Sequence, residues 1–464
     1  MRTTDPLTVV DLFAGCGGLS LGLELVGFEP ILVAELSKSA RDTYLENRLD
    51  LDATRVVTDV RGLSRGSRRQ LRAVAKLAPG EYPTLLSGGP PCQGFSGIGH
   101  RRTNSDVEKR EIASNHLYQD MVRIIGKLQP HFFLFENVRG LLSARWHRDK
   151  PGKVWDTIRK HFIRQLSGEY AIAFETVHGY QYGVPQNRPR VLMFGIHRRH
   201  WSHFGLDART VVDLHSALGC GEARGISSGL LPKPYEWKGF APHPTELLND
   251  LVDPHWERRK GPGGKRICPT YPAAATTAWQ KAMRPDASSW GKGLPLDNHE
   301  FSKHSVPVMK RFEEAQRSVD LQAPLEKRTK KFAQRALPEK WEAPPNITVA
   351  SLPDDFVHYK NRRSFTVREW ARLQGFPDSY KFLGPRTTGG HRRAGDVRSV
   401  DSVRETPRYT QIGNAVPVQL AAALGWHIRR LLGVPRTVSQ GPRWNTPLSE
   451  HLRSHFVGRD ETSG

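Results

Sequence analysis

Residues 7–27, LTVVDLFAGCGGLSLGLELVG, decide how the chain folds. Residues 7–13 form a nearly continuous apolar run of the length typical of a buried strand. Glycines follow at once, and apolar residues then recur at helical spacing from Leu19 to Val26, until Gly27, a residue type common at helix ends. The stretch therefore predicts a strand, a glycine-rich turn and a helix, in that order.

The same alternation continues through the first two hundred residues. Further strands are predicted at 31–34, 56–57, 84–86, 132–135, 171–177 and 191–196, and helices at 117–128 and from 154 to 162. Strands and helices that alternate at this rhythm predict an α/β fold with a doubly wound, mostly parallel sheet.

Periodic patterns that predict helices or strands are rare after residue 200, where Trp, Pro, Gly and basic residues dominate. A helix is predicted again from Thr366, which with Glu369 forms the pattern of a capping box, and residues 375–377, Gly-Phe-Pro, end that helix. We therefore expect a helix over 366–375, followed by a basic insertion at 385–408 and a final apolar helix near 420–432.

Charge and cysteine content narrow the class of protein. The chain has 464 residues, with 69 Lys and Arg against 47 Asp and Glu, so its formal net charge is +22, which favours nucleic acid as a partner. No apolar run is long enough for a signal peptide or a membrane span, so we expect an intracellular protein. The four cysteines are far apart, which predicts neither a disulfide framework nor a metal site.

The glycine cluster at 15–18 is the first candidate binding site. Glu35 lies 20 residues after Gly15, at the end of the second predicted strand, from which a carboxylate can accept hydrogen bonds from ribose hydroxyls. Together they favour a nucleoside-containing cofactor, although a simple tight turn is the alternative for the glycines. A nicotinamide site would want glycine where Ser20 stands, which disfavours an oxidoreductase.

Three later segments carry residue types suited to catalysis. Cys92, in GGPPCQGFS at 88–96, follows the fourth strand and is placed like a nucleophile, with an inert buried thiol as the alternative. Glu136 ends the fifth strand, where partial desolvation suits proton donation, but it could equally cap a helix. Arg188 and Arg190 are two residues apart and share a face if the segment is extended, or else form a solvated edge.

Six blocks in the chain resemble DNA cytosine-5 methyltransferases, in the order in which that family has them. They are Phe-Ala-Gly-Cys-Gly-Gly at 13–18, Pro-Pro-Cys-Gln at 90–93, Glu-Asn-Val at 136–138, Gln-x-Arg-x-Arg at 186–190, Arg-Leu-Gln-Gly-Phe-Pro at 372–377 and Gln-Ile-Gly-Asn-Ala-Val-Pro at 411–417. The resemblance covers roughly residues 8–200 and 346–432. It implies methyl transfer from S-adenosyl-L-methionine to carbon 5 of a flipped-out cytosine in a specific duplex DNA sequence.

The resemblance also implies roles for the catalytic residues. Cys92 would form a covalent adduct with carbon 6 of the cytosine, while Glu136 protonates N3. Arg190 would hold the carbonyl oxygen O2, with Arg188 beside it. A flipping loop is expected from Gln93 to about residue 115.

Cofactor contacts follow from the same likeness. Phe13 would lie against the adenine, Glu35 would hold the ribose, and Asp59 would accept from the adenine amino group. The methionine side would be shaped by Gly15, Gly17 and Asn414. One departure from the family is Ser37, where an acidic residue is usual.

The implied organisation has four parts. We expect a catalytic and cofactor-binding domain at 1–200 and a smaller, irregular target-recognition domain at 201–408 that includes the helix at 366–375. A segment at 409–435 would return to the catalytic domain, and 436–464 would be a mobile tail.

Two other functions within the family stay open at this point. One is a tRNA cytosine-5 methyltransferase, which the long middle region disfavours, and the other is a catalytically silent DNA-binding member. We expect a monomeric, cytoplasmic protein, associated with the nucleoid if bacterial, with a possible cognate restriction endonuclease acting on the same site.

Overall fold

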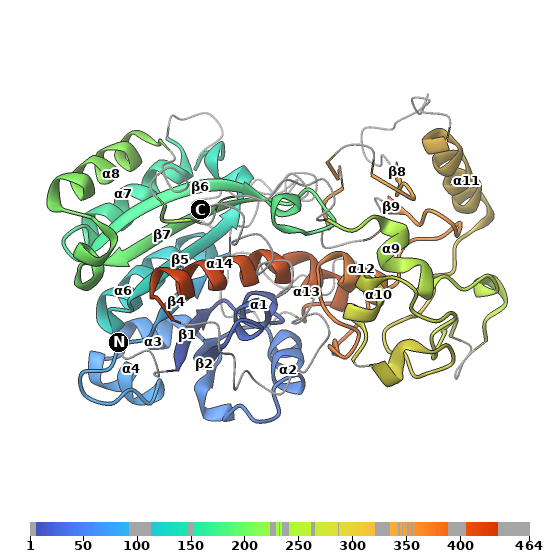
Figure 1. Cartoon of the computed structure of the whole chain (residues 1–464), viewed down its shortest axis with the longest axis horizontal. Coiled ribbons are helices and arrows are strands. Elements are labelled where there is room, and N and C mark those ends of the chain that lie inside the picture. Colours follow the sequence, from blue (N-terminus) through green and yellow to red (C-terminus); the bar gives the residue numbers. More distant parts are fainter. Residues whose placement is uncertain are drawn as a thin grey trace.

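A computed structural model of the chain describes residues 6–91, 113–146, 152–222, 229–231, 233, 241–260, 265–285, 287–320, 335–341, 344–345, 347–349, 353, 356–387 and 405–434. These residues form two lobes, a larger one built on a sheet and a smaller one of short helices and loops (Figure 1). Residues 93–112 of the predicted flipping loop, most of the insertion at 385–408 and the predicted tail at 436–464 lie outside the described residues.

The larger lobe is built on one seven-stranded sheet. Its strands are β1 (Leu7–Leu12), β2 (Phe28–Ala34), β3 (Val56–Val57), β4 (Leu85–Gly88), β5 (Phe132–Val138), β6 (Tyr170–His178) and β7 (Pro189–His197). They lie in the order β3-β2-β1-β4-β5-β7-β6, and β7 alone runs in the opposite direction to the other strands of this sheet. The predicted α/β class and mostly parallel sheet are therefore confirmed.

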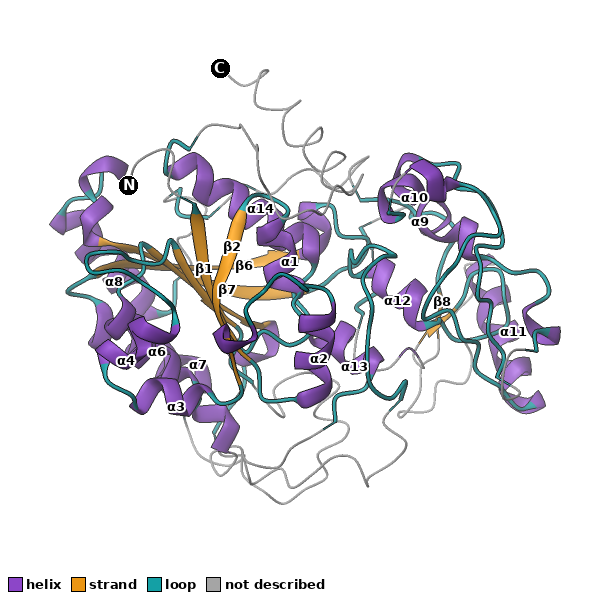
Figure 2. Ribbon diagram, turned by 90° about the horizontal axis from the view of Figure 1, so that it is seen from below, coloured by secondary structure: helices purple, strands orange, loops and turns teal. Residues whose placement is uncertain are grey.

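Both faces of this sheet are buried, as its continuous apolar strands require. On β5, Phe132 and Leu134 face one hydrophobic cluster, while Phe133 and Phe135 face the other. Successive side chains of a strand point to opposite faces, so one strand supplies both cores. The helices that cover the sheet come from distant parts of the chain (Figure 2).

One face carries α1 (Gly18–Glu24) and α14 (Val418–Leu431), and the other carries α3 (Val60–Arg65), α4 (Arg68–Val74), α6 (Tyr118–Leu128) and α7 (Val154–Leu166). Helix α1 approaches α14 closely, since a Cβ added at Gly22 would lie 2.5 Å from the Ala421 Cβ. Helix α2 (Lys38–Glu46) follows β2, and α8 (Ala208–Cys220) packs against β6 and α7.

The smaller lobe contains α9 (Pro244–Leu248), α10 (Ala278–Met283), α11 (Val306–Asp320), α12 (Val367–Leu373) and the strand pair β8 (Arg335–Ala336) and β9 (Phe356–Val357), with α13 (Arg408–Asn414) at its border (Figure 1). Buried ion pairs hold it together. Arg372 binds both Asp250, at 2.6 Å, and Asp378, at 2.6 Å, and Arg284 binds the same Asp250 at 2.8 Å. This polar interior explains why hydrophobic periodicity is poor there.

The predicted capping box is present at the start of α12, where the Thr366 side chain accepts from the Glu369 amide.

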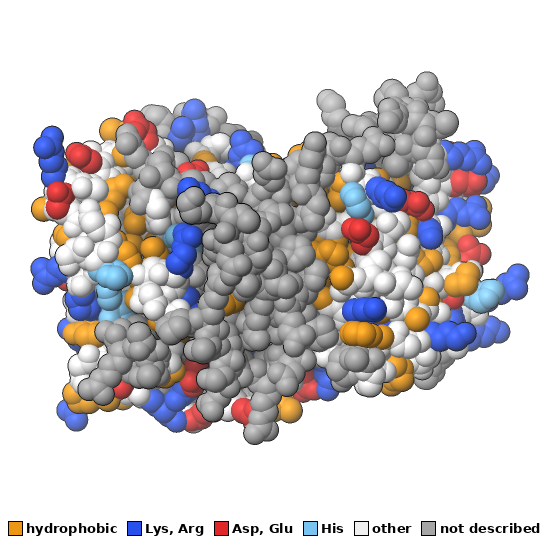
Figure 3. Space-filling model, viewed as in Figure 1, with side chains coloured by type: hydrophobic (Ala, Val, Ile, Leu, Met, Phe, Trp, Pro, Cys, Tyr) orange, Lys and Arg blue, Asp and Glu red, His pale blue; other side chains and the backbone are white. Residues whose placement is uncertain are grey.

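Basic side chains lie on both lobes of the face shown in Figure 3. Among the described helices, none is long and apolar enough to cross a membrane.

Candidate active site

The candidate residues gather where the parallel strands β1, β2, β4 and β5 end, at one edge of the sheet. The glycine loop, residues 13–17, follows β1, and Glu35 follows β2. Gly89 follows β4, and Glu136 lies near the end of β5. The fold therefore brings together segments that are more than a hundred residues apart in sequence.

The glycine loop makes a sharp turn. Phe13, Gly15 and Gly17 have positive φ angles of 60°, 56° and 85°, a conformation that glycine adopts readily and an aromatic residue rarely does. The Ala14 amide donates to the Ala34 carbonyl oxygen at 3.1 Å and so ties the loop to the end of β2. A Cβ added at Gly15 would meet nothing within 4 Å, which leaves open space on that side of the loop.

Glu35 fixes the glycine loop from the neighbouring strand. Its Oε2 accepts a hydrogen bond from the Gly15 amide and its Oε1 accepts one from the Ser37 amide, both at 2.8 Å. Burial raises the pKa of Glu35, while these two amides act in the opposite direction. The two residues that the sequence placed 20 positions apart are therefore in direct contact.

Asp59 and Asn414, the other two residues predicted to contact the cofactor, lie at helix ends. Asp59 caps α3 by accepting from the Arg61 amide at 2.9 Å; burial would raise its pKa, but the hydrogen bonds and charge of Arg61 lower it. Asn414 ends α13 and is exposed. The turn that follows it packs on the glycine loop, because a Cβ added at Gly18 would lie 2.5 Å from the Val416 carbonyl oxygen.

Glu136 and Arg190 form a buried ion pair between β5 and β7. Their side chains are only 10% and 6% exposed. Burial lowers the pKa of Arg190, and the negative charge of Glu136 opposes that effect. A hydrogen-bonding acid and a cation are thus held together in a site shielded from water, where electrostatic interactions are strong.

The turn that leads to Cys92 passes directly over Glu136. A Cβ added at Gly89 would lie 2.7 Å from Glu136 Oε2, so a larger residue there would have to displace the Glu136 carboxylate. The Asn137 side-chain amide donates to the Pro90 carbonyl oxygen at 3.0 Å. Pro91 is the last residue described before a gap, and Cys92 itself lies outside the described residues.

Arg188 contacts different groups from Arg190. Its buried guanidinium donates to the carbonyl oxygens of Val349 and Gly413, which belong to the smaller lobe and to α13. Burial, together with the charge of Arg190, lowers the pKa of Arg188 well below its usual value. The two arginines are neighbours, but Arg188 binds backbone whereas Arg190 binds the candidate acid.

Several polar residues around the site carried no role in the sequence prediction. Gln186 accepts from the Val349 amide at 2.8 Å and donates to the Leu373 carbonyl oxygen at 2.8 Å, so it joins three distant segments. Asp11, at the end of β1, accepts from Ser20 at 2.5 Å, and burial raises its pKa to about 7. A charged residue inside an otherwise apolar strand was the available signal for Asp11.

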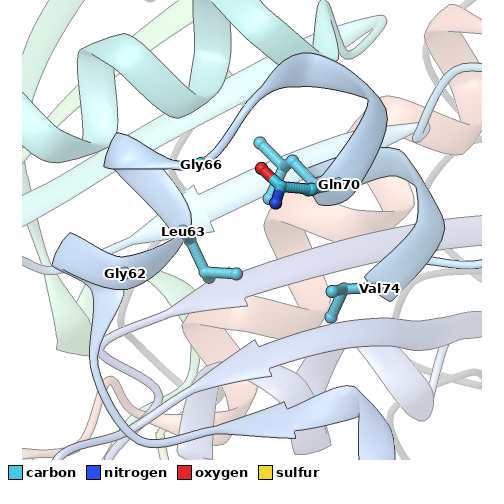
Figure 4. Close-up of a pocket in the computed structure, with 6 residues that line it drawn as sticks. Gly62, Leu63, Gly66, Gln70 and Val74 are labelled. Carbon is cyan, nitrogen blue, oxygen red and sulfur yellow. The ribbon is translucent and has the colours of Figure 1, made fainter.

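A separate pocket of about 340 Å³ opens between α3 and α4. It is lined by Gly62, Leu63, Gly66, Gln70, Leu71 and Val74 (Figure 4). None of the candidate residues lines it, and its walls are mostly apolar. This pocket is therefore separate from the candidate site at the edge of the sheet.

Comparison with known families gives the geometry a context. The model of the C-5 cytosine-specific DNA methylase family matches residues 7–430. The chain belongs to this family. This DNA cytosine-5 methyltransferase is 27% identical, over 91% of its length and 88% of the relative's, to the Type II methyltransferase M.DdeI of Desulfomicrobium norvegicum.

A second relative of the methyltransferase is the Type II methyltransferase M.AgeI of Thalassovita gelatinovora. It is 25% identical, over 91% of this chain and 99% of the relative. Among solved structures, the methyltransferase is similar to an E. coli protein described as a DNA modification methyltransferase encoded within a prophage. That match has a TM-score of 0.54 and 22% identity, covers 92% and 99% of the two chains, and supports the shared fold.

Proposed function

We propose that this methyltransferase uses Cys92 as the nucleophile and the Glu136–Arg190 pair to hold and activate a cytosine rotated out of duplex DNA. The observation that carries the proposal is the buried ion pair directly beneath the Gly89–Pro90 turn, two residues before Cys92. A buried acid paired with a cation, next to the turn that precedes Cys92, supports a catalytic use for these groups.

The reaction explains why these residue types are needed together. Carbon 5 of cytosine is a poor nucleophile, so the Cys92 thiolate first forms a bond to carbon 6 and the ring electrons move towards N3. Glu136 gives a proton to N3, and Arg190 donates a hydrogen bond to O2. Carbon 5 then takes the methyl group and loses its proton to water, N3 returns its proton to Glu136, and the bond between sulfur and carbon 6 breaks, which regenerates the thiolate.

The residues present fit S-adenosyl-L-methionine at the glycine loop. Gly15 faces open space, and the Glu35 carboxylate, which accepts from the Gly15 and Ser37 amides, has further lone pairs that can accept from a ribose hydroxyl. When bound, this group supplies the methyl from its sulfonium. Phe13 and Asp59 would hold the adenine and Glu35 the ribose, and the loop with Asn414 would face the methionine end.

The substrate must be unstacked before this chemistry can occur, because carbon 6 of a stacked cytosine cannot reach a thiol. We assign the flipping to residues 93–115 and the reading of the site to the irregular region at 201–408. The formal charge of +22 and the basic side chains on both lobes suit contact with phosphates. A cognate restriction endonuclease is the partner that Type II relatives suggest.

Duplex DNA with 5-fluorocytosine at the target tests the nucleophile, since fluorine at carbon 5 prevents release of the adduct. Sites are first located by bisulfite sequencing of DNA from cells that express the chain. The wild-type protein should form a complex that survives denaturing electrophoresis in the presence of S-adenosyl-L-methionine. Cys92→Ser should form none, yet bind DNA within about twofold of wild type.

Cys220→Ser is the matched control, because Cys220 is an exposed thiol at the end of α8, outside the candidate site. It should form the adduct as wild type does. Turnover or adduct formation by Cys92→Ser would remove Cys92 from the mechanism.

A further inference from the structure

Four buried side chains lie directly beneath the glycine loop and are called here the Arg48 cluster: Glu24, Tyr44, Arg48 and Tyr380. Arg48 binds both oxygens of the Glu24 carboxylate, each at 2.7 Å. Its guanidinium lies 3.9 Å from the centre of the Tyr44 ring, and its Nη1 donates to the Tyr380 hydroxyl at 3.0 Å. A paired, stacked guanidinium of this kind is held in one orientation.

The Arg48 cluster touches the backbone of the glycine loop at two successive residues. The Tyr380 hydroxyl donates to the Cys16 carbonyl oxygen, and Arg48 Nη2 donates to the Gly17 carbonyl oxygen at 3.3 Å. Gly17 sits on the cluster so closely that an added Cβ would lie 2.9 Å from Arg48 Nη1 and 3.0 Å from the Tyr380 oxygen. Both peptide planes are therefore fixed from below, while Gly15 faces open space.

Tyr380 is itself fixed by contacts on either side of it in sequence. Asn47 pairs with the backbone of Lys381 through two hydrogen bonds of 2.8 Å, which docks this segment on the end of α2. Arg368, in α12, donates to the Tyr380 carbonyl oxygen at 2.9 Å. The phenol thus reaches the glycine loop from a segment anchored to both α2 and α12.

We propose that Tyr380 is a positioning residue for S-adenosyl-L-methionine, acting through the Cys16 carbonyl, while Arg48 and the Leu21 amide hold the neighbouring Gly17 carbonyl. The inference rests on the proposed function, since it takes the glycine loop as the cofactor site. Tyr380 does not touch the cofactor. It keeps the Cys16 carbonyl oxygen turned away from the side of the loop that faces the ligand, because rotation of that peptide plane would exchange the positions of its C=O and N–H groups.

Tyr380→Phe tests this role in the full chain. The ring keeps its packing against Phe376 and Phe382, whose centroids lie 4.9 and 5.4 Å away, and only the hydroxyl is lost. Calorimetry with S-adenosyl-L-homocysteine should show a Kd raised about tenfold, the equivalent of one hydrogen bond. The KM for S-adenosyl-L-methionine should rise equally, with kcat at saturation and the Kd for DNA within about twofold of wild type.

Tyr170→Phe is the matched control, since the buried Tyr170 hydroxyl also donates to a backbone carbonyl, that of Pro130, at 2.9 Å. It should lose similar stability in urea but leave the cofactor Kd unchanged. Arg48→Lys is a second variant that keeps a positive charge beside Glu24 and removes the guanidinium contacts to the loop. It should weaken the cofactor in the same direction as Tyr380→Phe.

The outcomes separate this inference from the proposed function. If wild type binds no S-adenosyl-L-homocysteine, the assignment of the glycine loop as the cofactor site fails. If wild type binds it and both Tyr380→Phe and Arg48→Lys bind as tightly as Tyr170→Phe, the positioning role is overturned. A loss confined to kcat, with KM unchanged, also overturns it.

Discussion

Asn137 donates a buried hydrogen bond of 3.0 Å to the carbonyl oxygen of Pro90, although 47 residues separate the two along the chain. Asn137 follows the proposed acid Glu136 directly, and Pro90 precedes the proposed nucleophile Cys92 by two residues. The Asn137 side-chain amide therefore sets the spacing between Glu136 and the turn that precedes Cys92. A misplacement of even 1 Å between reacting groups can cost a large part of the rate.

Asn137→Ala should for this reason slow the chemistry without affecting the cofactor. We expect the rate of adduct formation on 5-fluorocytosine DNA to fall by about tenfold or more, with an unchanged Kd for S-adenosyl-L-homocysteine. Asn361→Ala is the control, because Asn361 is also buried and donates to a backbone carbonyl, that of Asp253, at 3.2 Å in the smaller lobe. Equal slowing by both variants would refute a special role for Asn137.

Glu136→Gln should separate catalysis from binding. The amide keeps the size of the side chain and a hydrogen bond, but it cannot supply a proton to N3. We expect the single-turnover methylation rate to fall by about 10²–10⁴-fold, the usual contribution of a general acid. The Kd for DNA should stay within about threefold. Glu29→Gln, at an exposed carboxylate on β2, should leave both unchanged, and a Glu136 variant that methylates normally would exclude the proton-donor role.

The two arginines of the 186–190 block should behave differently when each is changed to lysine. Arg190→Lys keeps a positive charge beside Glu136 but loses the guanidinium, and we expect single-turnover methylation to slow by about 10–100-fold. Arg188→Lys cannot satisfy both the Val349 and Gly413 carbonyls and should lower the free energy of unfolding by about 1–3 kcal/mol. Both variants are measured by urea unfolding and by rapid-quench kinetics. A slower methylation rate only in Arg188→Lys, with lower stability only in Arg190→Lys, would contradict the roles inferred from the contacts.

Asp11 should make stability depend on pH. Burial raises its pKa to about 7, from an unfolded value near 3.8, so the folded protein binds the extra proton between these values. The free energy of unfolding should therefore fall as pH rises from about 4 to 7 and level off above that range. Asp11→Asn should flatten this slope in urea titrations between pH 5 and 8.

Asp207→Asn serves as the control for that measurement. Asp207 is an exposed cap of α8, and hydrogen bonds from Thr210 lower its pKa, so it does not titrate in the range studied. The slope of its free energy of unfolding against pH should match that of the wild-type protein. An Asp11→Asn slope as steep as wild type would mean that other groups carry the pH dependence.

The sheet could be predicted from sequence because its signals are local. Apolar runs such as Phe132 to Phe135 predict buried strands wherever the chain closes on them, and the glycines after β1 predict a turn. The spacing of Gly15 and Glu35 also predicted that both belong to one candidate site, since parallel strands end at the same edge, but it did not predict the hydrogen bond between them.

The buried ion pairs of the smaller lobe and the contacts around the candidate site could not be predicted, because they join residues that are far apart in sequence. Arg284 and Arg372 are completely buried, although sequence analysis treats such residues as surface. Their partner Asp250 lies more than a hundred residues before Arg372, and Tyr380 reaches Cys16 across 364 positions. Arg188 was expected beside Arg190, because alternate residues of an extended segment share one face. Its hydrogen-bond partners nevertheless come from other segments of the chain.

The close approach of α1 to α14 has a consequence for how the protein is made. The apolar side of α1 emerges from the ribosome early, but the helix that covers it is encoded some four hundred residues later. At typical rates of synthesis this leaves the surface bare for roughly 20–80 s. Nascent chains should therefore need chaperone protection until translation is almost finished, and fragments truncated before residue 418 should aggregate.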